Sequence, residues 1–230
     1  MPGSAAPRAI LSRSALERNA AALLSVGGLA DLRHDAYGHG ADEVAPIVAR
    51  AGATGILVDG PEMADRLTPV GIPVVIDGAA DAGPHRLFGI PDASMIPPAE
   101  PVMRLEGHVL STKPLLAGEA VSYGYTHRAE RDTTVALVTG GYAQGILRAL
   151  GNRVRVQVGE RTHPIVGRIA MDVCVVDLEG ADADAGSAVV YFGGTGAMRD
   201  ALGRWSQATG LTALEMAVVT GRHVEREWIA

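Results

Sequence analysis

One short stretch gathers most of the side chains in this sequence that could perform acid–base or anion-binding chemistry. Arg33, His34, Asp35, Tyr37 and His39 directly follow an apolar run over 26–30. An apolar run that ends in a polar, glycine-rich turn before a helical pattern is typical of a strand in a parallel sheet. Loops converge at the carboxyl edge of such a sheet, so these residues predict a candidate site. The plainer interpretation is a strand that ends in a polar turn.

Composition restricts the class of protein. The chain has 230 residues, a formal net charge of −6 and 47% hydrophobic residues, which describes a soluble globular protein with at least one core. The acidic balance argues against a nucleic-acid partner, and no apolar run reaches membrane-spanning length. The single cysteine, Cys174, excludes an intramolecular disulfide and favours a reducing, cytoplasmic location.

The segment 1–101 predicts alternating strands and helices. Ser14 and Glu17 fit a capping box that opens a helix ending at Leu24, Gly52 ends a second helix, and Pro61 opens a third. The predicted strands are 7–12, the run before Arg33, 55–58 and 74–77, and the second helix covers 42–51. This βαβαβ order predicts a parallel sheet with right-handed crossovers.

From residue 102 the pattern changes to that of an antiparallel sheet. The segments alternate or are β-branched, with turn residues between them, and Gly159 marks a hairpin turn. The predicted strands are 104–115, 120–125, 133–138, 154–167, 173–178 and 188–192, followed by helices at 198–209 and 213–220, each closed by a glycine. The sequence therefore predicts an α/β lobe over 1–101 followed by an all-β domain over 102–230.

Several motifs are similar to those of one enzyme family. Residues 35–40, Asp-Ala-Tyr-Gly-His-Gly, resemble the signature of the alanine racemases, and the segments 121–125, 140–145, 148–153 and 164–172 resemble motifs of that family's β domain. The resemblance implies a (β/α)8 barrel joined to a C-terminal β domain and the cofactor pyridoxal phosphate (PLP). It also implies a homodimer whose clefts are shared between subunits.

The lobe is too short for that barrel. A complete (β/α)8 barrel takes about 250 residues. Residues 87–90, Leu-Phe-Gly-Ile, resemble the last barrel strand, yet almost nothing separates them from the strand predicted at 74–77. The resemblance thus implies a truncated TIM-type α/β barrel lobe, about half of which is deleted near 77–84. Its open edges and apolar inner face would need cover from the segment 79–101, a partner chain or a ligand.

The resemblance also assigns residues of the catalytic site. Arg33 stands where the family has the lysine that forms the Schiff base with PLP. Tyr142 matches the opposing acid–base tyrosine from the partner subunit, Met171 and Asp172 match the pair that borders the substrate pocket, and Tyr37 matches a phosphate contact. A guanidinium stays protonated and forms no comparable Schiff base, so Arg33 cannot replace the lysine.

Other cofactor contacts are implied to be missing. Ala82 falls where an arginine contacts the pyridine nitrogen, Pro84 and His85 fall where backbone amides hold the phosphate, and Leu214 falls where a second pocket tyrosine is expected. Lys113 is the only lysine of the chain, and its place in an alternating β segment predicts a solvated side chain. These departures imply that the ancestral PLP is lost and that no cofactor is bound.

Three functional hypotheses follow. The first is a pseudoenzyme, an alanine-racemase-like protein that has lost racemization and has a binding or regulatory role. The second is an enzyme recruited to PLP-independent chemistry on a small molecule, for example in specialised metabolism. It would use Tyr37, His39, Tyr142, Asp172 and either His34 or Arg33 in the residual dimer cleft. The third is a residual PLP-dependent alanine racemase that forms D-alanine.

Each candidate also has a plainer explanation. His39 belongs to a helix-opening turn and can be satisfied by local hydrogen bonds. Tyr142 can be an inherited structural tyrosine once its opposing base is gone. Metal ligation by His34, Asp35 and His39 lacks an established ligand spacing, so we predict no metal site.

Overall fold

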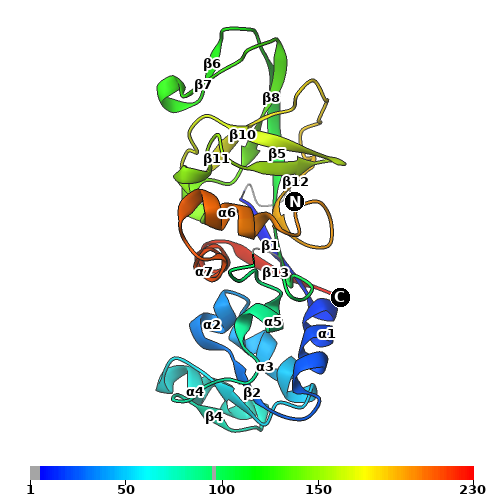
Figure 1. Cartoon of the computed structure of the whole chain (residues 1–230), viewed down its shortest axis with the longest axis vertical. Coiled ribbons are helices and arrows are strands. Elements are labelled where there is room, and N and C mark those ends of the chain that lie inside the picture. Colours follow the sequence, from blue (N-terminus) through cyan, green and yellow to red (C-terminus); the bar gives the residue numbers. More distant parts are fainter. Residues whose placement is uncertain (1–5, 95–96) are drawn as a thin grey trace.

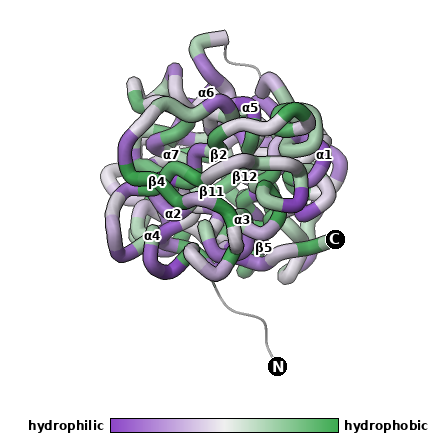
Figure 2. Tube along the Cα trace, turned by 90° about the horizontal axis from the view of Figure 1, so that it is seen from below, coloured by the Kyte–Doolittle hydropathy of each residue, from purple (hydrophilic) through white to green (hydrophobic). Residues whose placement is uncertain are grey.

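The computed structural model describes residues 6–94 and 97–230. The molecule is elongated, with a β domain at one end and a lobe of helices and short strands at the other (Figure 1). Helices α6 (Ala201–Thr209) and α7 (Ala213–His223) lie between them. Seen from the end of the lobe, apolar stretches run largely through the middle of the outline, and hydrophilic ones are common on its outer bends (Figure 2). Within the described ranges, no helix has the length and apolar character needed to cross a bilayer.

The lobe is built on a small parallel sheet. Strands β2 (Leu29–Asp31), β3 (Gly55–Leu57) and β4 (Val74–Val75) pair in that order, with Asp31 opposite Leu57 and Leu57 opposite Val75. The parallel pairing is as predicted, although β4 is shorter than the strand expected at 74–77.

Helices cover the sheet and follow the predicted order. They are α1 (Arg13–Leu24), α3 (Ala41–Arg50), α4 (Pro61–Leu67) and the short 3-10 turn η1 (Thr68–Val70). Leu16, Val44 and Ile56 are fully buried in the core between helices and sheet. The cap of α1 differs from the prediction, because Ser12 accepts the hydrogen bond from the backbone N–H of Ala15 and Ser14 lies within the helix.

After β4 the chain returns to the opposite edge of the sheet. Ala82 forms a parallel bridge with Ala30 of β2, and the backbone N–H of Asp31 donates to the Ala82 carbonyl oxygen at 3.1 Å. A helix follows, α5 (Pro84–Phe88). The strand predicted at 87–90 is therefore wrong, because Pro84 pre-sets the backbone of a first helical turn after Gly83.

An aspartate lies at or just beyond the end of each lobe strand. Asp31 is the last residue of β2, whereas Asp59 and Asp77 each lie two residues beyond β3 and β4 and are exposed. Ile76 is also 42% exposed. The apolar inner face expected from the sequence is thus interrupted at the strand ends by carboxylates, which water can solvate.

Strand β5 (Met103–Leu115) organises the β domain. Its first half pairs antiparallel with β12 (Ala188–Gly193), and its second half pairs antiparallel with β8 (Thr133–Thr139). Strands β9 (Arg155–Val158), β10 (Arg161–Val166) and β11 (Val173–Asp177) complete the order β12-β9-β10-β11-β8-β5. Because β5 also pairs with β12, the six strands close into an antiparallel barrel.

Two parts of the β domain differ from the predicted strands. The strand expected at 120–125 contains only β6 (Ala120–Val121), which pairs with β7 (His127–Arg128), and Tyr123–Tyr125 form the 3-10 turn η2. The other difference concerns β1 (Arg8–Ser12). It joins the β domain, where it pairs antiparallel with β5 and parallel with β13 (Glu225–Ile229). The sequence missed β13 because its residues are mostly charged and exposed.

Helix α7 packs closely against both the lobe and the β domain. A Cβ atom on Gly221 would lie 2.1 Å from the carbonyl oxygen of Gly38, in the turn after β2. The neighbouring Thr220 packs on Gly145 of the β domain, where an added Cβ would lie 3.0 Å from the Thr220 Oγ1. Gly221 was expected to close this helix, but α7 continues through it to His223.

The contact between Gly38 and Gly221 gives the first prediction. Gly221→Ala should lower the free energy of unfolding by about 1–3 kcal/mol, because a methyl group there must push two backbones apart. Chemical denaturation would measure the loss. Gly60→Ala is the control, since a Cβ at Gly60 meets nothing within 4 Å. Equal stability of the two variants would contradict the close packing of α7 on the turn.

Candidate functional site

The chain leaves β2 through a left-handed turn. Residues 34–37 have φ angles between 52° and 56°, so α2 (Arg33–Tyr37) winds in the opposite sense to an ordinary helix. Each such residue costs about 1–2 kcal/mol, and the turn therefore needs support from its surroundings. Asp35 supplies part of it, because its carboxylate accepts hydrogen bonds from the backbone N–H of Ala41 at 2.8 Å and from Arg226 of β13.

This turn brings Asp31, Arg33 and Tyr37 together at the end of β2. Asp31 is only 2% exposed. Its Oδ1 accepts hydrogen bonds from Nε and the backbone N–H of Arg33, at 2.9 and 3.2 Å. Its Oδ2 accepts from Nη2 of Arg33 at 2.6 Å and from the Tyr37 hydroxyl at 2.9 Å. Both oxygens of the buried carboxylate are thus occupied, while the Arg33 side chain stays 42% exposed.

The charges of this group are fixed by its contacts. Burial opposes ionisation of Asp31, but the hydrogen bonds from Arg33 and Tyr37 lower its pKa below the usual value overall. The same carboxylate raises the pKa of Arg33, and burial with the Asp31 hydrogen bond raises the pKa of Tyr37 to about 12. At neutral pH the group therefore holds a carboxylate, a guanidinium and a neutral phenol, none of which is a free nucleophile.

The two histidines near this group differ in their surroundings. The His34 side chain is 55% exposed, and its Nδ1 lies 3.2 Å from the Asp59 carboxylate. His39 is buried, its Nδ1 donates to the Ala36 carbonyl oxygen at 2.9 Å, and its ring stacks on Phe88. Burial lowers the pKa of His39 to about 4, which favours a structural role in the turn. Over the described ranges, no three His, Cys, Asp or Glu side chains group as a metal site would require.

A second group of polar side chains surrounds a hollow of about 640 Å³ in the β domain. Tyr142 lies in the 3-10 turn η3 (Tyr142–Gln144), and its backbone N–H donates to the Ala170 carbonyl oxygen at 3.0 Å. The guanidinium of Arg148, in the turn η4 (Arg148–Leu150), lies over the Tyr142 ring at 4.3 Å. This cation–π contact orients the tyrosine and places a positive charge beside it.

The rest of the hollow combines exposed and fixed side chains. Asp172 accepts a hydrogen bond from Nε2 of Gln144 at 3.0 Å. Met171 is 54% exposed and Tyr123 is 76% exposed. Arg168 lines the same hollow. Two tyrosines and two arginines therefore line a concavity that suits a small anionic or zwitterionic molecule.

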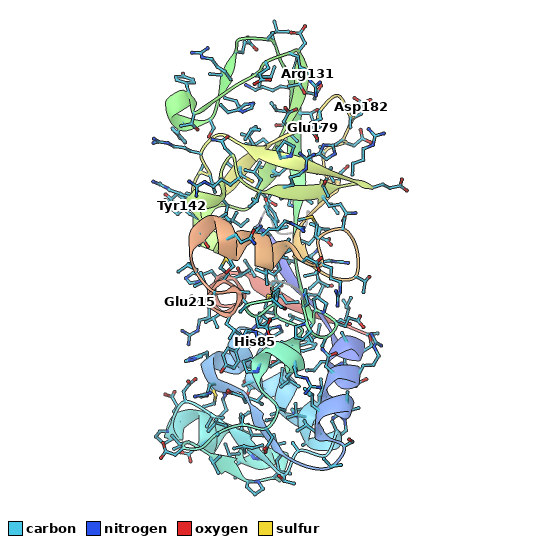
Figure 3. The ribbon with its side chains drawn as sticks, viewed as in Figure 1. His85, Arg131, Tyr142, Glu179, Asp182 and Glu215 are labelled. Atoms are coloured by element: carbon cyan, nitrogen blue, oxygen red, sulfur yellow. The ribbon has the colours of Figure 1, made fainter. Side chains whose placement is uncertain are left out.

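The predicted site residues fall into two separate groups. Tyr142, Met171 and Asp172 share the hollow of the β domain, whose lining residues all belong to that domain. Arg33 and Tyr37 lie at the end of β2. Figure 3 places Tyr142 on the β-domain side of α6 and α7, whereas His85 lies on α5, on the lobe side. A single chain therefore does not bring Arg33 and Tyr142 into one cleft.

Sequence reasoning missed four residues that the structure adds to these groups. Asp31 is the partner of Arg33, and a signal existed, because a single residue separates this acid from this base in the sequence. Tyr123 and Arg168 join Tyr142 only through the folding of turns that are distant in sequence, and Arg148 joins it from the next 3-10 turn. No local spacing would have gathered them.

Comparison with known proteins finds similarity to alanine racemases. The family model "Alanine racemase, C-terminal domain" matches residues 102–228. The alanine racemase of Mycolicibacterium vanbaalenii is 47% identical over 95 residues, which are 40% of this chain and 24% of that protein. The alanine racemase of Chlorobaculum tepidum is 36% identical over 130 residues, which are 56% of this chain and 33% of that protein. The chain thus matches a third or less of the length of these relatives.

Solved structures show the same fold. The alanine racemase of a D-cycloserine-producing Streptomyces lavendulae superposes with a TM-score of 0.85 at 21% identity, over 98% of this chain and 97% of that chain. The alanine racemase of E. faecalis superposes with a TM-score of 0.83 at 18% identity, over the whole of both chains. At these identities the likeness concerns the fold.

The pairing of Asp31 with Arg33 predicts an unusual dependence of stability on pH. Arg33→Met should lower the free energy of unfolding at neutral pH by about 2 kcal/mol. Breaking a fully buried ion pair costs about 3–5 kcal/mol, and the loss is smaller here because Arg33 is partly solvated. Folding lowers the pKa of Asp31, so its contribution is present above the unfolded-state pKa and is lost as pH falls through the folded pKa. The difference between variant and parent should therefore shrink in acid.

Denaturant titrations across a pH series would measure this difference. Arg8→Met serves as the control, since Arg8 pairs with Glu227 on the surface, where both side chains are nearly half exposed. We expect that control to change stability little. A loss for Arg33→Met as small as that of the control would contradict the buried pair.

Proposed function

This chain belongs to the alanine racemase family, and we propose that it has lost PLP-dependent racemization and acts as a binding or regulatory protein. The observation that carries the proposal is the ion pair between Arg33 and the buried Asp31. It occupies the position where the resemblance expects a lysine that forms a Schiff base. A guanidinium has no amine that can condense with an aldehyde at a working pH.

The remaining lysine offers no substitute within the lobe. Lys113 lies on β5 in the β domain, away from the end of β2, in a hollow that adjoins that of Tyr142 because Tyr123 and Arg168 line both. It lines an apolar concavity with Leu137 and Val175. A cofactor held there would lack the acid–base partners that the family signature supplies.

Other side chains also fit PLP poorly. The hydroxyl of Tyr37 is committed to Asp31, and Ala82 is buried and brings no cation. Pro84 opens α5 without an N–H group to donate, and Leu214 on α7 has no hydroxyl. The residues of the lobe therefore do not suit the cofactor, and we derive no reaction step through it.

We also infer that the lobe is the remnant of a barrel. In a closed barrel the last strand lies beside the first, and here the chain after the proposed deletion pairs with β2 through Ala30 and Ala82. The curated relatives are longer than this chain, since 95 aligned residues are 40% of it but 24% of the Mycolicibacterium vanbaalenii protein. The structural matches extend over nearly all of both chains, so the likeness of fold is not confined to the β domain.

A second candidate is PLP-independent chemistry in the hollow of the β domain. One observation favours it: Tyr123, Tyr142, Arg148 and Arg168 surround a space large enough for a small molecule. Such a site could bind a carboxylate and move a proton through a tyrosine. The third hypothesis, residual racemization with PLP, has no comparable support from the lobe.

Exposed apolar side chains support the proposed homodimer. Tyr123 and Tyr125 in the turn η2 are 76% and 70% exposed, and Met171 beside them is 54% exposed. Large exposed apolar side chains that cluster beside a polar hollow are typical of an interface. A second copy is the partner that we propose, with its lobe facing the hollow and completing the cleft.

The loss of cofactor chemistry predicts a negative covalent test. Incubation with PLP followed by borohydride should give no adduct on a side chain, only background labelling of the chain's α-amine, because position 33 has no amine. The alanine racemase of Mycolicibacterium vanbaalenii is the positive control. A stable adduct mapped to Lys113 by peptide mass spectrometry, and absent from a Lys113→Arg variant, would contradict the proposal and favour the third hypothesis.

The dimer gives a separate prediction. Analytical ultracentrifugation should give twice the chain mass, and Tyr125→Asp should shift the equilibrium toward the monomer, since a carboxylate would be buried in an apolar contact. Val26→Asp is the matched control, because Val26 is 96% exposed in the lobe. An unchanged dimer of Tyr125→Asp would place the interface elsewhere.

A further inference from the structure

We propose that Asp31 is the positioning residue that fixes a positive charge at position 33, so that an amine introduced there would stay protonated and unreactive toward carbonyl groups. This proposal extends the proposed loss of cofactor chemistry. It rests on that proposed function only in taking position 33 as the place of the family lysine. Its basis is the arrangement of Asp31, Arg33 and Tyr37 in this chain.

Both oxygens of the Asp31 carboxylate are fully used as hydrogen-bond acceptors. It accepts hydrogen bonds from two guanidinium nitrogens, from the backbone N–H of Arg33 and from the Tyr37 hydroxyl. At 2% exposure it is nearly removed from water, so a cation must remain beside it. The charge at position 33 is therefore required by Asp31, independently of any ligand.

The other charged side chains nearby do not replace Arg33 as the partner of Asp31. His34 pairs with Asp59, Asp35 pairs with Arg226 and Arg66, and Asp81 accepts from the backbone N–H of Leu29. Among the described residues, Arg33 is the cation within salt-bridge distance of Asp31. The other aspartates nearby are already paired or hydrogen-bonded, so Asp31 depends on Arg33 for its counter-charge.

With Asp31 in place, an amine at position 33 could be present and still be unreactive. An amine attacks a carbonyl carbon only when it is neutral, and a carboxylate in contact raises the pKa of an amine. Arg33→Lys would thus restore the amine but leave it protonated against Asp31. Removing the carboxylate charge as well should lower the pKa of that amine.

Competitive acetylation tests this directly, with Lys113 as a reference inside the same chain. Arg33→Lys and the double variant Asp31→Asn with Arg33→Lys would be labelled with trace acetic anhydride over a pH series and analysed by peptide mass spectrometry. In the single variant, the introduced amine should titrate above Lys113. In the double variant its midpoint should fall by at least about one unit, and its neutral-pH labelling relative to Lys113 should rise about tenfold.

Equal midpoints in the two variants would overturn the proposal, because Asp31 would then not control the charge at position 33. Thermal unfolding would verify that each variant is folded. Asn is close in shape to Asp, so the double variant removes the charge with little change in volume.

A second measurement needs no introduced amine. Asp31 raises the pKa of Tyr37, so Asp31→Asn alone should move the Tyr37 titration, followed by NMR of labelled tyrosine, back toward its ordinary value. Tyr142 is the control and should not move. An unchanged Tyr37 would also overturn the proposal.

The two claims can fail separately. Adduct formation or racemization by the unmodified protein would refute the proposed loss of cofactor chemistry but leave the titration results intact. Unchanged titrations with no adduct would refute the role of Asp31 and leave that loss standing.

Discussion

The ion pair between Asp31 and Arg33 is the interaction on which the character of this protein depends. A buried carboxylate at the end of β2 requires a permanent positive charge beside it, and an arginine provides one at any working pH. The hydroxyl of Tyr37 completes the hydrogen bonding. The end of β2 is thus a closed, charge-balanced group, held in a left-handed turn that Asp35, Arg226 and the contact between Gly38 and Gly221 support.

The two parts of the chain differ in how much of a site they retain. The β domain closes into a complete six-stranded barrel, and its turns gather Tyr123, Tyr142, Arg148 and Arg168 around one hollow. The lobe has only three parallel strands and one bridge, and its strand ends carry aspartates. The family likeness accordingly rests mainly on residues 102–228. A shared fold does not by itself fix an activity, so the hollow of the β domain is considered on its own residues.

Local patterns were sufficient to predict most of the strands and helices. The alternating segments around β5, β8 and β11 and the turn at Gly159 were predicted close to their observed bounds, because period-two alternation reports a half-buried strand. Long-range pairing was beyond such reasoning. β1 joins the β domain through β5 and β13, and Leu87 and Phe88 belong to a helix opened by Pro84. The residues of the hollow come from separate turns, so only the folded chain brings them together.

The central claim is that the protein does not labilise the Cα hydrogen of alanine. The most direct measurement is proton NMR of L-alanine in deuterium oxide with the purified protein and added PLP, compared with PLP alone. We predict no exchange at Cα and no D-alanine above the PLP control. Exchange that requires the protein, and that a Tyr123→Phe or Tyr142→Phe variant abolishes, would contradict the account.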